Sequence, residues 1–159
     1  GVLDQVGANA TFCMVGDNAH KYPHLVEEVR RRGHRIGNHT YNHVGGLRWL
    51  PWKYLGKVVK AEKVLHSHKL FRPPHGWMRP TQYRVMRYTD WTIVMWELVT
   101  RDYSKRLTAD DVLANVKRYA RNGSIITFHD SLRSIDKLKA ILLPALQWLR
   151  DEGYEFKTF

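Results

Sequence analysis

Two histidines four residues apart, His39 and His43, have the side chains and the spacing that could hold one metal ion. They open and close the segment His-Thr-Tyr-Asn-His, directly after a short strand-like run. Imidazole nitrogens are common ligands of Zn²⁺ and of other divalent first-row metals. His20 and His24 have the same spacing by comparison, but Pro23 lies between them at a predicted helix start. We therefore interpret His20 and His24 as solvated surface residues and keep the first pair as candidate ligands.

Polar side chains also follow three later strand-like runs. Arg72 ends one run, Asp102 lies a few residues beyond a second, and His129 directly follows a third. Each has a structural interpretation by itself: a buried ion pair, a turn or capping residue, and a hydrogen-bonded strand-end histidine. In parallel α/β barrels, however, functional residues project from the carboxyl ends of the strands. With the histidine pair, these residues predict an active site on one rim of a sheet.

The elements that must position these residues alternate along the chain. Apolar periodicity, prolines at helix starts and glycines at helix ends indicate six strands and five helices. Thr108 and Ser134 are predicted helix caps, and Pro144 should kink the last helix. Such alternation is typical of a parallel α/β domain. The predicted strands are 10–15, 35–38, 69–72, 91–96, 124–128 and 154–158, and the predicted helices are 23–32, 51–66, 80–89, 108–122 and 134–152.

Length and composition limit the number of domains and the class of protein. The chain has 159 residues, of which 43% are apolar, so we expect a single domain over 1–159 with a real core. Residues 1–7 resemble the last turn of a helix, so the preceding strand should be missing, which would leave an open sheet edge. No long apolar run or signal-peptide pattern is present, and we expect no membrane span. The single Cys13 excludes an intrachain disulfide and should be a small buried hydrophobe.

Positive charge dominates among the ionisable residues. Lys and Arg outnumber Asp and Glu by 26 to 15, which gives a formal net charge of +11. This favours anionic partners such as a nucleic acid, an anionic lipid surface or an acidic glycan. The densest group, residues 30–32 with Arg35, falls at the end of a predicted helix, where cations complement the helix dipole and face water. No nucleic-acid motif with interleaved aromatic residues is present, so we expect no nucleic-acid partner.

The order of the polar segments resembles that of the polysaccharide deacetylases, the family-four carbohydrate esterases. The likeness covers the whole chain and includes the Gly-Asn that precedes the histidine pair and the Gly-Tyr-Glu-Phe near the end. The segments that carry it are His39-Thr-Tyr-Asn-His43, Arg72-Pro-Pro-His-Gly76, Arg101-Asp102-Tyr103 and Thr127-Phe128-His129.

This resemblance implies a fold, a reaction and a cofactor. The fold would be a distorted (β/α)-barrel with parallel strands, its first strand missing from this chain. The activity would be hydrolysis of acetyl groups on N-acetylated amino-sugar polysaccharide or peptidoglycan, so the partner would be an acetylated glycan. One divalent metal would assist the hydrolysis, because a bound metal lowers the pKa of water from about 15.7 toward roughly 7. The metal would most simply be Zn²⁺, with Co²⁺, Ni²⁺ or Mn²⁺ as alternatives. The family's usual substrates suggest an extracytoplasmic or cell-envelope location, and the oligomeric state stays open.

The resemblance also implies roles for individual residues. His39 and His43 would bind the metal, and the catalytic residues would be His129 as general acid, Asp102 in the polar network around it, and Arg72. The family's third ligand and its base are adjacent aspartates in a Thr-Phe-Asp-Asp-Gly motif, which these 159 residues do not contain. Arg72 would hold that base aspartate. The residues expected to contact substrate are His75, through its backbone N–H, with Tyr103 and Thr127.

Four departures from the family pattern bear on the substrate. Val99 and Tyr103 stand where the family usually has the first Asp and the Trp of Asp-x-x-Asp-Trp, and one polar partner is lost. Thr127 stands where Leu is favoured, which would make the acetyl pocket more polar, and His75 stands where Tyr is common. Two alternatives follow: an O-acetyl esterase or small-amide hydrolase of the same fold, and a non-catalytic basic glycan-binding domain, which the missing aspartate pair favours.

Overall fold

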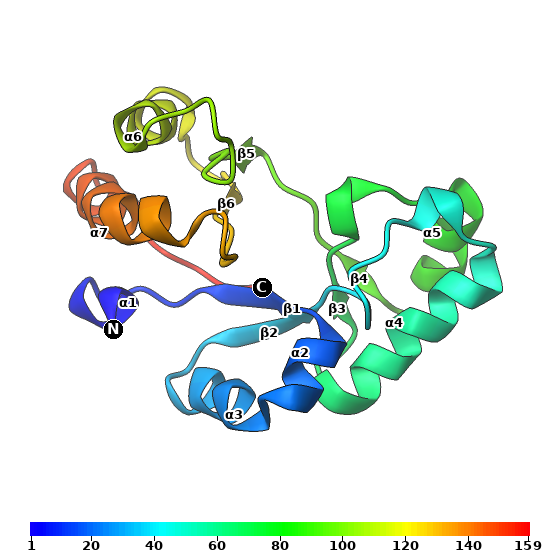
Figure 1. Cartoon of the computed structure of the whole chain (residues 1–159). Coiled ribbons are helices and arrows are strands. Elements are labelled where there is room, and N and C mark those ends of the chain that lie inside the picture. Colours follow the sequence, from blue (N-terminus) through cyan, green and yellow to red (C-terminus); the bar gives the residue numbers. More distant parts are fainter. The chain divides into compact units, whose positions relative to one another are not determined.

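The computed structural model describes all 159 residues, which divide into two compact units (Figure 1). The N-terminal unit comprises residues 9–95 with 158–159, and the C-terminal unit comprises residues 1–8 and 96–157. Each unit carries part of the predicted site, and each is described by itself. The single-domain expectation stays a prediction.

A four-stranded parallel sheet forms the centre of the N-terminal unit. Its strands follow the order β1-β2-β3-β4, so neighbours in sequence are neighbours in the sheet. Asn38, the last residue of β2, is level with Met14 on one side and Phe71 on the other. The residues that follow these strands therefore emerge at the same edge. The strands are β1 (Thr11–Met14), β2 (Arg35–Asn38), β3 (Leu70–Phe71) and β4 (Thr92–Ile93).

Four helices accompany this sheet. Those predicted to begin at a proline do so, because proline fixes a helical φ and its missing N–H is not needed in the first turn. The 3₁₀ turns Gly46–Arg48 and Pro74–Gly76 interrupt the loops after β2 and β3. The helices are α2 (Gly16–Lys21), α3 (Pro23–Arg31), α4 (Pro51–Leu65) and α5 (Pro80–Tyr88).

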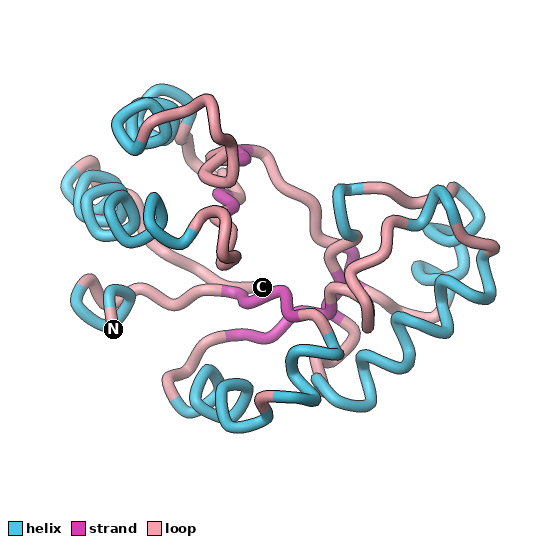
Figure 2. The backbone as a smooth tube through the Cα atoms, in the orientation of Figure 1, coloured by secondary structure: helices cyan, strands magenta, loops and turns pink.

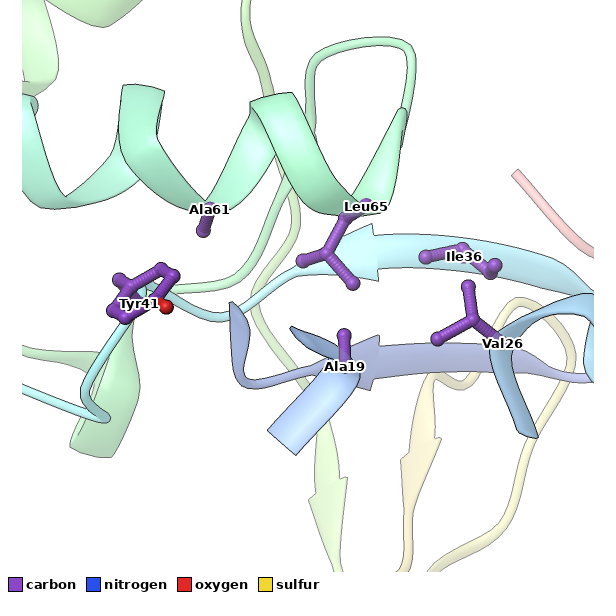
Figure 3. Close-up of a cluster of buried hydrophobic side chains, with 6 residues drawn as sticks. All are labelled: Ala19, Val26, Ile36, Tyr41, Ala61 and Leu65. Atoms are coloured by element: carbon purple, nitrogen blue, oxygen red, sulfur yellow. The ribbon is translucent and has the colours of Figure 1, made fainter. Parts of the chain in front are cut away.

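Two apolar clusters bury the inner faces of these helices. The first lies between α2, α3, α4 and β2, where small alanines let the backbones approach (Figure 3). The second joins α4 and α5 to β3. Helix α4 contributes to both clusters, so it is packed along much of its length. The first cluster is Ala19, Val26, Ile36, Tyr41, Ala61 and Leu65, and the second is Tyr54, Val58, Phe71, Met86 and Trp91.

The C-terminal unit is built on two packed helices and a short strand pair. Strands β5 (Leu98–Val99) and β6 (Ile126–Thr127) are parallel, with Val99 level with Thr127. Helix α6 (Ala109–Tyr119) packs on α7 (Ile135–Asp151) through Val116, Ala145 and Leu149, and the short α1 (Val2–Gln5) also contacts α7. Thr108 caps α6 as predicted, because its Oγ1 accepts the Asp111 N–H at 3.1 Å.

Four expectations about the elements are wrong. Residues 154–158 form no strand: Tyr154 bonds to the Ala120 carbonyl through its hydroxyl and the segment packs by side chains. Of the strand expected at 91–96, only the two residues of β4 form a strand, and the next strand, β5, lies in the other unit. Helix α2 was not expected. Ser134 stands at the N-cap of α7 but gives no capping bond, because its hydroxyl turns back to the His129 carbonyl.

The parallel α/β architecture is confirmed, and the closed barrel stays a prediction. The strands form one sheet of four and one of two, and Figure 2 shows how short they are beside the helices. None of the helices combines the length and the apolar character that crossing a bilayer requires.

Cys13 in β1 should react slowly with alkylating agents. Burial raises the pKa of its thiol above the ordinary value, an effect that the nearby Arg72 charge opposes in part. Because only the thiolate attacks, iodoacetamide at pH 8 should label the native chain at least about tenfold more slowly than the urea-unfolded chain. The native rate should rise as the pH passes 9. Mass spectrometry of timed samples measures both rates, and equal rates would contradict the half-buried placement of this thiol.

Candidate active-site residues

His39 is the first residue after β2, and the strand register places it beside Arg72. Its Nδ1 lies 2.7 Å from the Arg72 backbone oxygen. A carbonyl only accepts hydrogen bonds, so Nδ1 carries the proton and donates, which leaves the lone pair on Nε2. A backbone carbonyl commonly fixes a metal-binding histidine in this tautomer.

The surroundings of His39 keep it neutral. Burial lowers its pKa to about 4; the bond to the Arg72 carbonyl opposes this, and the nearby His43, Arg72 and His75 add to the lowering. A metal ligand must offer an unprotonated nitrogen, so at neutral pH this imidazole needs to lose no proton before binding.

The His43 ring stands beside the His39 ring, with centroids 4.9 Å apart, and the His75 ring lies 5.1 Å from His43. No group of three or more His, Cys, Asp and Glu side chains in the chain is arranged to hold a metal ion. The expectation that His39 and His43 bind a metal ion therefore stays a prediction.

A strained loop presents the pair. Thr40 and His43 both have positive φ, at +62° and +54°, a region that non-glycine residues rarely adopt. Two side chains hold the loop: the buried Asn38 Oδ1 accepts the Thr40 N–H at 3.0 Å, and the Thr40 Oγ1 accepts the Val44 N–H at 3.1 Å. Asn38 Nδ2 also donates to the Val58 carbonyl at 2.9 Å. These positioning roles do not follow from the residue types alone, although the Gly-Asn-His-Thr segment is an uncommon one.

The loop is fixed further on by Gln82, which is fully buried on α5. Its amide donates to the Gly46 carbonyl at 2.9 Å and to the Trp49 carbonyl at 3.2 Å, and its oxygen accepts the Arg79 N–H at 2.9 Å. Gly46 in turn donates to the Trp77 carbonyl at 2.7 Å. This network ties the segment after His43 to the segment after His75.

Gly46→Ala should lower the free energy of unfolding by about 2–3 kcal/mol. A Cβ at this position would lie 2.3 Å from the Gln82 oxygen and 2.8 Å from the Trp77 carbonyl, so the network must open. Gly56→Ala on α4 is the matched control, because its Cβ would meet nothing within 4 Å. That variant should gain about 0.5–1 kcal/mol. Urea denaturation measures both, and equal stabilities would refute the tight packing at Gly46.

Arg72 follows β3 and points its guanidinium at the Met95 carbonyl, to which Nη2 donates at 2.9 Å. Its Nε is buried without a partner. A buried guanidinium nitrogen normally bonds to an acceptor, and a carboxylate is the acceptor it fits best. The orphaned Nε agrees with the expected task of holding an aspartate, and that task stays a prediction.

His75 is exposed and has a positive φ of +56° within its 3₁₀ turn. The N–H groups of Gly76 and Trp77 are already engaged by the carbonyls of Pro73 and Pro74. The His75 ring leans on the Trp77 ring with centroids 5.3 Å apart. The expected role of its backbone N–H in binding the oxyanion stays a prediction.

In the C-terminal unit, Asp102 holds His129 at two points. The carboxylate is fully buried and accepts the His129 backbone N–H at 2.7 Å, and its other oxygen lies 2.8 Å from His129 Nδ1. Because a carboxylate accepts, Nδ1 carries the proton and Nε2 is the nitrogen left for a reacting group. The His129 side chain is 37% exposed, so this nitrogen is within reach of solvent or substrate.

Three other residues surround this Asp–His pair. Tyr103 stands edge-on to the His129 ring with centroids 4.7 Å apart. Thr127 ends β6 two residues before the histidine, and its Oγ1 is buried without a partner. Its expected contact with substrate stays a prediction. Ser134, which sequence reasoning treated only as a cap, bonds to the His129 carbonyl and to Ser131, and so holds the histidine loop.

The predicted site residues thus form two groups. His39, His43, Arg72 and His75 come together in the N-terminal unit. Asp102, Tyr103, Thr127 and His129 come together in the C-terminal unit. His20 and His24 are exposed, as expected.

Known proteins resemble this chain in sequence and in structure. The model of the polysaccharide deacetylase family matches residues 1–94. A peptidoglycan-N-acetylglucosamine deacetylase of Bacillus cereus is 31% identical over 166 residues, which cover 98% of this chain and 58% of the relative. The chain therefore spans little more than half of that protein.

Two solved structures share the fold. The Bc1960 peptidoglycan N-acetylglucosamine deacetylase gives a TM-score of 0.89 at 31% identity, over 99% of this chain and 76% of that one. A family 4 carbohydrate esterase from Streptomyces lividans, in complex with acetate, gives 0.88 at 26% identity, over 99% of this chain and 82% of that one. Since the family model covers more than half of the chain, and the motifs noted in the sequence stand in the family's order, this chain belongs to the polysaccharide deacetylase family.

Proposed function

We propose that this chain carries the metal-binding histidines and the general acid of a deacetylase that acts on N-acetylated amino-sugar polymers of the peptidoglycan type. The observation that carries this proposal is the buried Asp102 carboxylate, which bonds to both the backbone and the ring of His129. This arrangement supports an acid role, because the carboxylate fixes the tautomer and leaves Nε2 for a reacting group. The relatives' names support the substrate class.

Each residue then has a task that its surroundings allow. When bound, a divalent metal, most simply Zn²⁺, would polarise the acetyl carbonyl and lower the pKa of water. His39 would hold it through Nε2, the nitrogen that its bond to the Arg72 carbonyl leaves without a proton, and His43 would be the second ligand. Arg72 would fix a carboxylate through its unpartnered Nε, and the His75 backbone N–H would donate to the oxyanion.

The departing amine needs a proton, and His129 would supply it. Amines are poor leaving groups, so Nε2 of a protonated His129 would give its proton to the nitrogen as the C–N bond breaks. Asp102 would stabilise the imidazolium before the transfer and keep Nε2 toward the reacting group afterwards. The Tyr103 ring and the Thr127 hydroxyl would shape the substrate side of this histidine.

The test is acetate release from N-acetylglucosamine oligomers, with Zn²⁺ or Co²⁺ added. We would compare this chain with the same chain extended at its N-terminus by a strand that bears the family's Asp-Asp motif. The extended protein should release acetate, and this chain alone should bind metal weakly and release little. If the extended protein bound metal stoichiometrically yet released no acetate from any such oligomer, the deacetylase proposal would fail.

The same assay separates the alternatives. Release of acetate from O-acetylated xylan, and not from N-acetylated oligomers, would indicate the esterase. Retention on insoluble glycan without release from any substrate would indicate a binding domain.

A further inference from the structure

A second group of basic side chains lies in the N-terminal unit, at the start of β2 rather than at its end. It lines a cavity of about 190 Å³. Arg35 opens β2 and His39 follows it, so the rise of a strand separates these two residues by roughly 13 Å. This cavity, here named the basic pocket, is lined by Arg30, His34, Arg35, Ile36, His66 and His68.

The lining carries positive charge that carboxylates only partly balance. Arg30 is paired with Glu27 and also donates to the Leu65 carbonyl, whereas the exposed Arg35 has no carboxylate partner. Glu62 on α4 is engaged elsewhere, by the Ser67 hydroxyl and the Lys69 N–H. The pocket itself contains no acidic side chain. A concave site of this kind concentrates anions.

One lining atom lacks the partner that its burial requires. Nδ1 of His34 is buried and makes no hydrogen bond, while the ring packs against Phe12 with centroids 5.3 Å apart. Buried ring nitrogens are nearly always bonded. His34 is therefore a lining residue whose hydrogen-bonding capacity the chain itself does not fill.

The loop that brings in the other two histidines is held in an uncommon conformation. His66, His68 and Lys69 have φ values of +44°, +53° and +59°. Ser67 between them is buried and bonded to Glu62, so the conformation is fixed by the surrounding structure. Strained non-glycine residues of this kind gather at sites that bind ligands.

We propose that the basic pocket binds a phosphoryl group. The guanidinium fork of Arg35 matches two phosphate oxygens, and the histidines add donors around a tetrahedral anion. The group belongs either to a small phosphate such as inorganic phosphate or to the phosphodiester chain of an anionic polymer. Because the pocket lies away from the histidine pair, this binding does not depend on the proposed deacetylase function.

Titration of the full chain with inorganic phosphate, followed by NMR of its backbone amides, tests the proposal. Binding should be saturable, with the largest shifts at residues 34–36 and 66–69. Arg35→Gln should raise the Kd by roughly tenfold, as loss of a charge-assisted contact predicts. The control Arg84→Gln removes an exposed arginine of α5, outside the pocket, and should leave the Kd unchanged.

Other results of these titrations would overturn the proposal or identify the ligand. Equal weakening by both variants, or shifts spread over the surface without saturation, would show attraction by net charge alone and overturn the proposal. If Arg35→Gln does not fold, His68→Gln takes its place with the same expectation. A parallel titration with poly(glycerol phosphate) distinguishes the two sources of the phosphoryl group. Tighter binding per phosphate than inorganic phosphate shows, lost in Arg35→Gln, would identify a polymer. Equal binding per phosphate would identify a small phosphate.

Discussion

His129→Ala should slow acetate release by roughly 10²–10⁴-fold and leave metal binding unchanged. The assay uses the chain extended by the Asp-Asp strand. The reason is that Asp102 occupies Nδ1 at 2.8 Å and leaves Nε2 as the proton donor to the amine. The His129 ring is not one of the two expected metal ligands, His39 and His43, so the metal content should stay the same. Initial rates of acetate release and elemental analysis after dialysis measure the two quantities.

An exposed histidine supplies the control for this experiment. His24→Ala removes an imidazole at the surface of α3 and should change neither turnover nor metal content. Turnover that survives in His129→Ala would remove the acid role from this residue.

His43→Ala in the same extended protein should weaken Zn²⁺ binding by more than about 100-fold and abolish activity. Even residues that only support a metal ligand change affinity by about 10–100-fold, so loss of a ligand should exceed that range. Competition with a chromogenic chelator measures the affinity.

His75→Ala is the matched variant, because its ring lies 5.1 Å from His43 but is not an expected ligand. It should keep the metal. Metal retained in His43→Ala would mean that the pair is not a ligand pair, and metal lost from His75→Ala would mean that the ligand set is different.

Local patterns predicted the elements whose ends carry strong signals. The strand at 35–38 and the helices that open at Pro23, Pro51 and Pro80 stand where proline and apolar periodicity placed them. Helix α2 was not predicted, because Gly16, Asp17 and Asn18 are poor helix formers. Tertiary contacts stabilise it, since Gly16 donates to the Thr40 carbonyl and Asp17 to the Tyr41 carbonyl. The segment 154–158 alternates like a strand, but its side chains pack on helices and its backbone pairs with no strand.

The candidate residues could be named from the sequence, and their contacts could not. Asp102 and His129 stand 27 positions apart, and only the β5–β6 register, with Val99 level with Thr127, brings them together. The positive φ of Thr40 and His43 leaves no mark in residue type, because glycine or asparagine would be the usual choice there. Asn38 and Gln82 were not predicted as positioning residues because they bond to the distant backbone groups of Val58 and Gly46. Ser134 was not predicted because its hydroxyl turns back to the His129 carbonyl and does not cap α7.

The two-point bond between Asp102 and His129 has an evolutionary consequence. The carboxylate fixes the loop through the backbone N–H and the tautomer through the ring, so the acid role needs both residues together. A descendant that lost the histidine would retain a buried carboxylate with one partner fewer, and selection for stability would favour its replacement by a neutral residue. Once both are gone, no single mutation restores the acid. We therefore expect inactive lineages of this fold that have lost this pair to stay inactive.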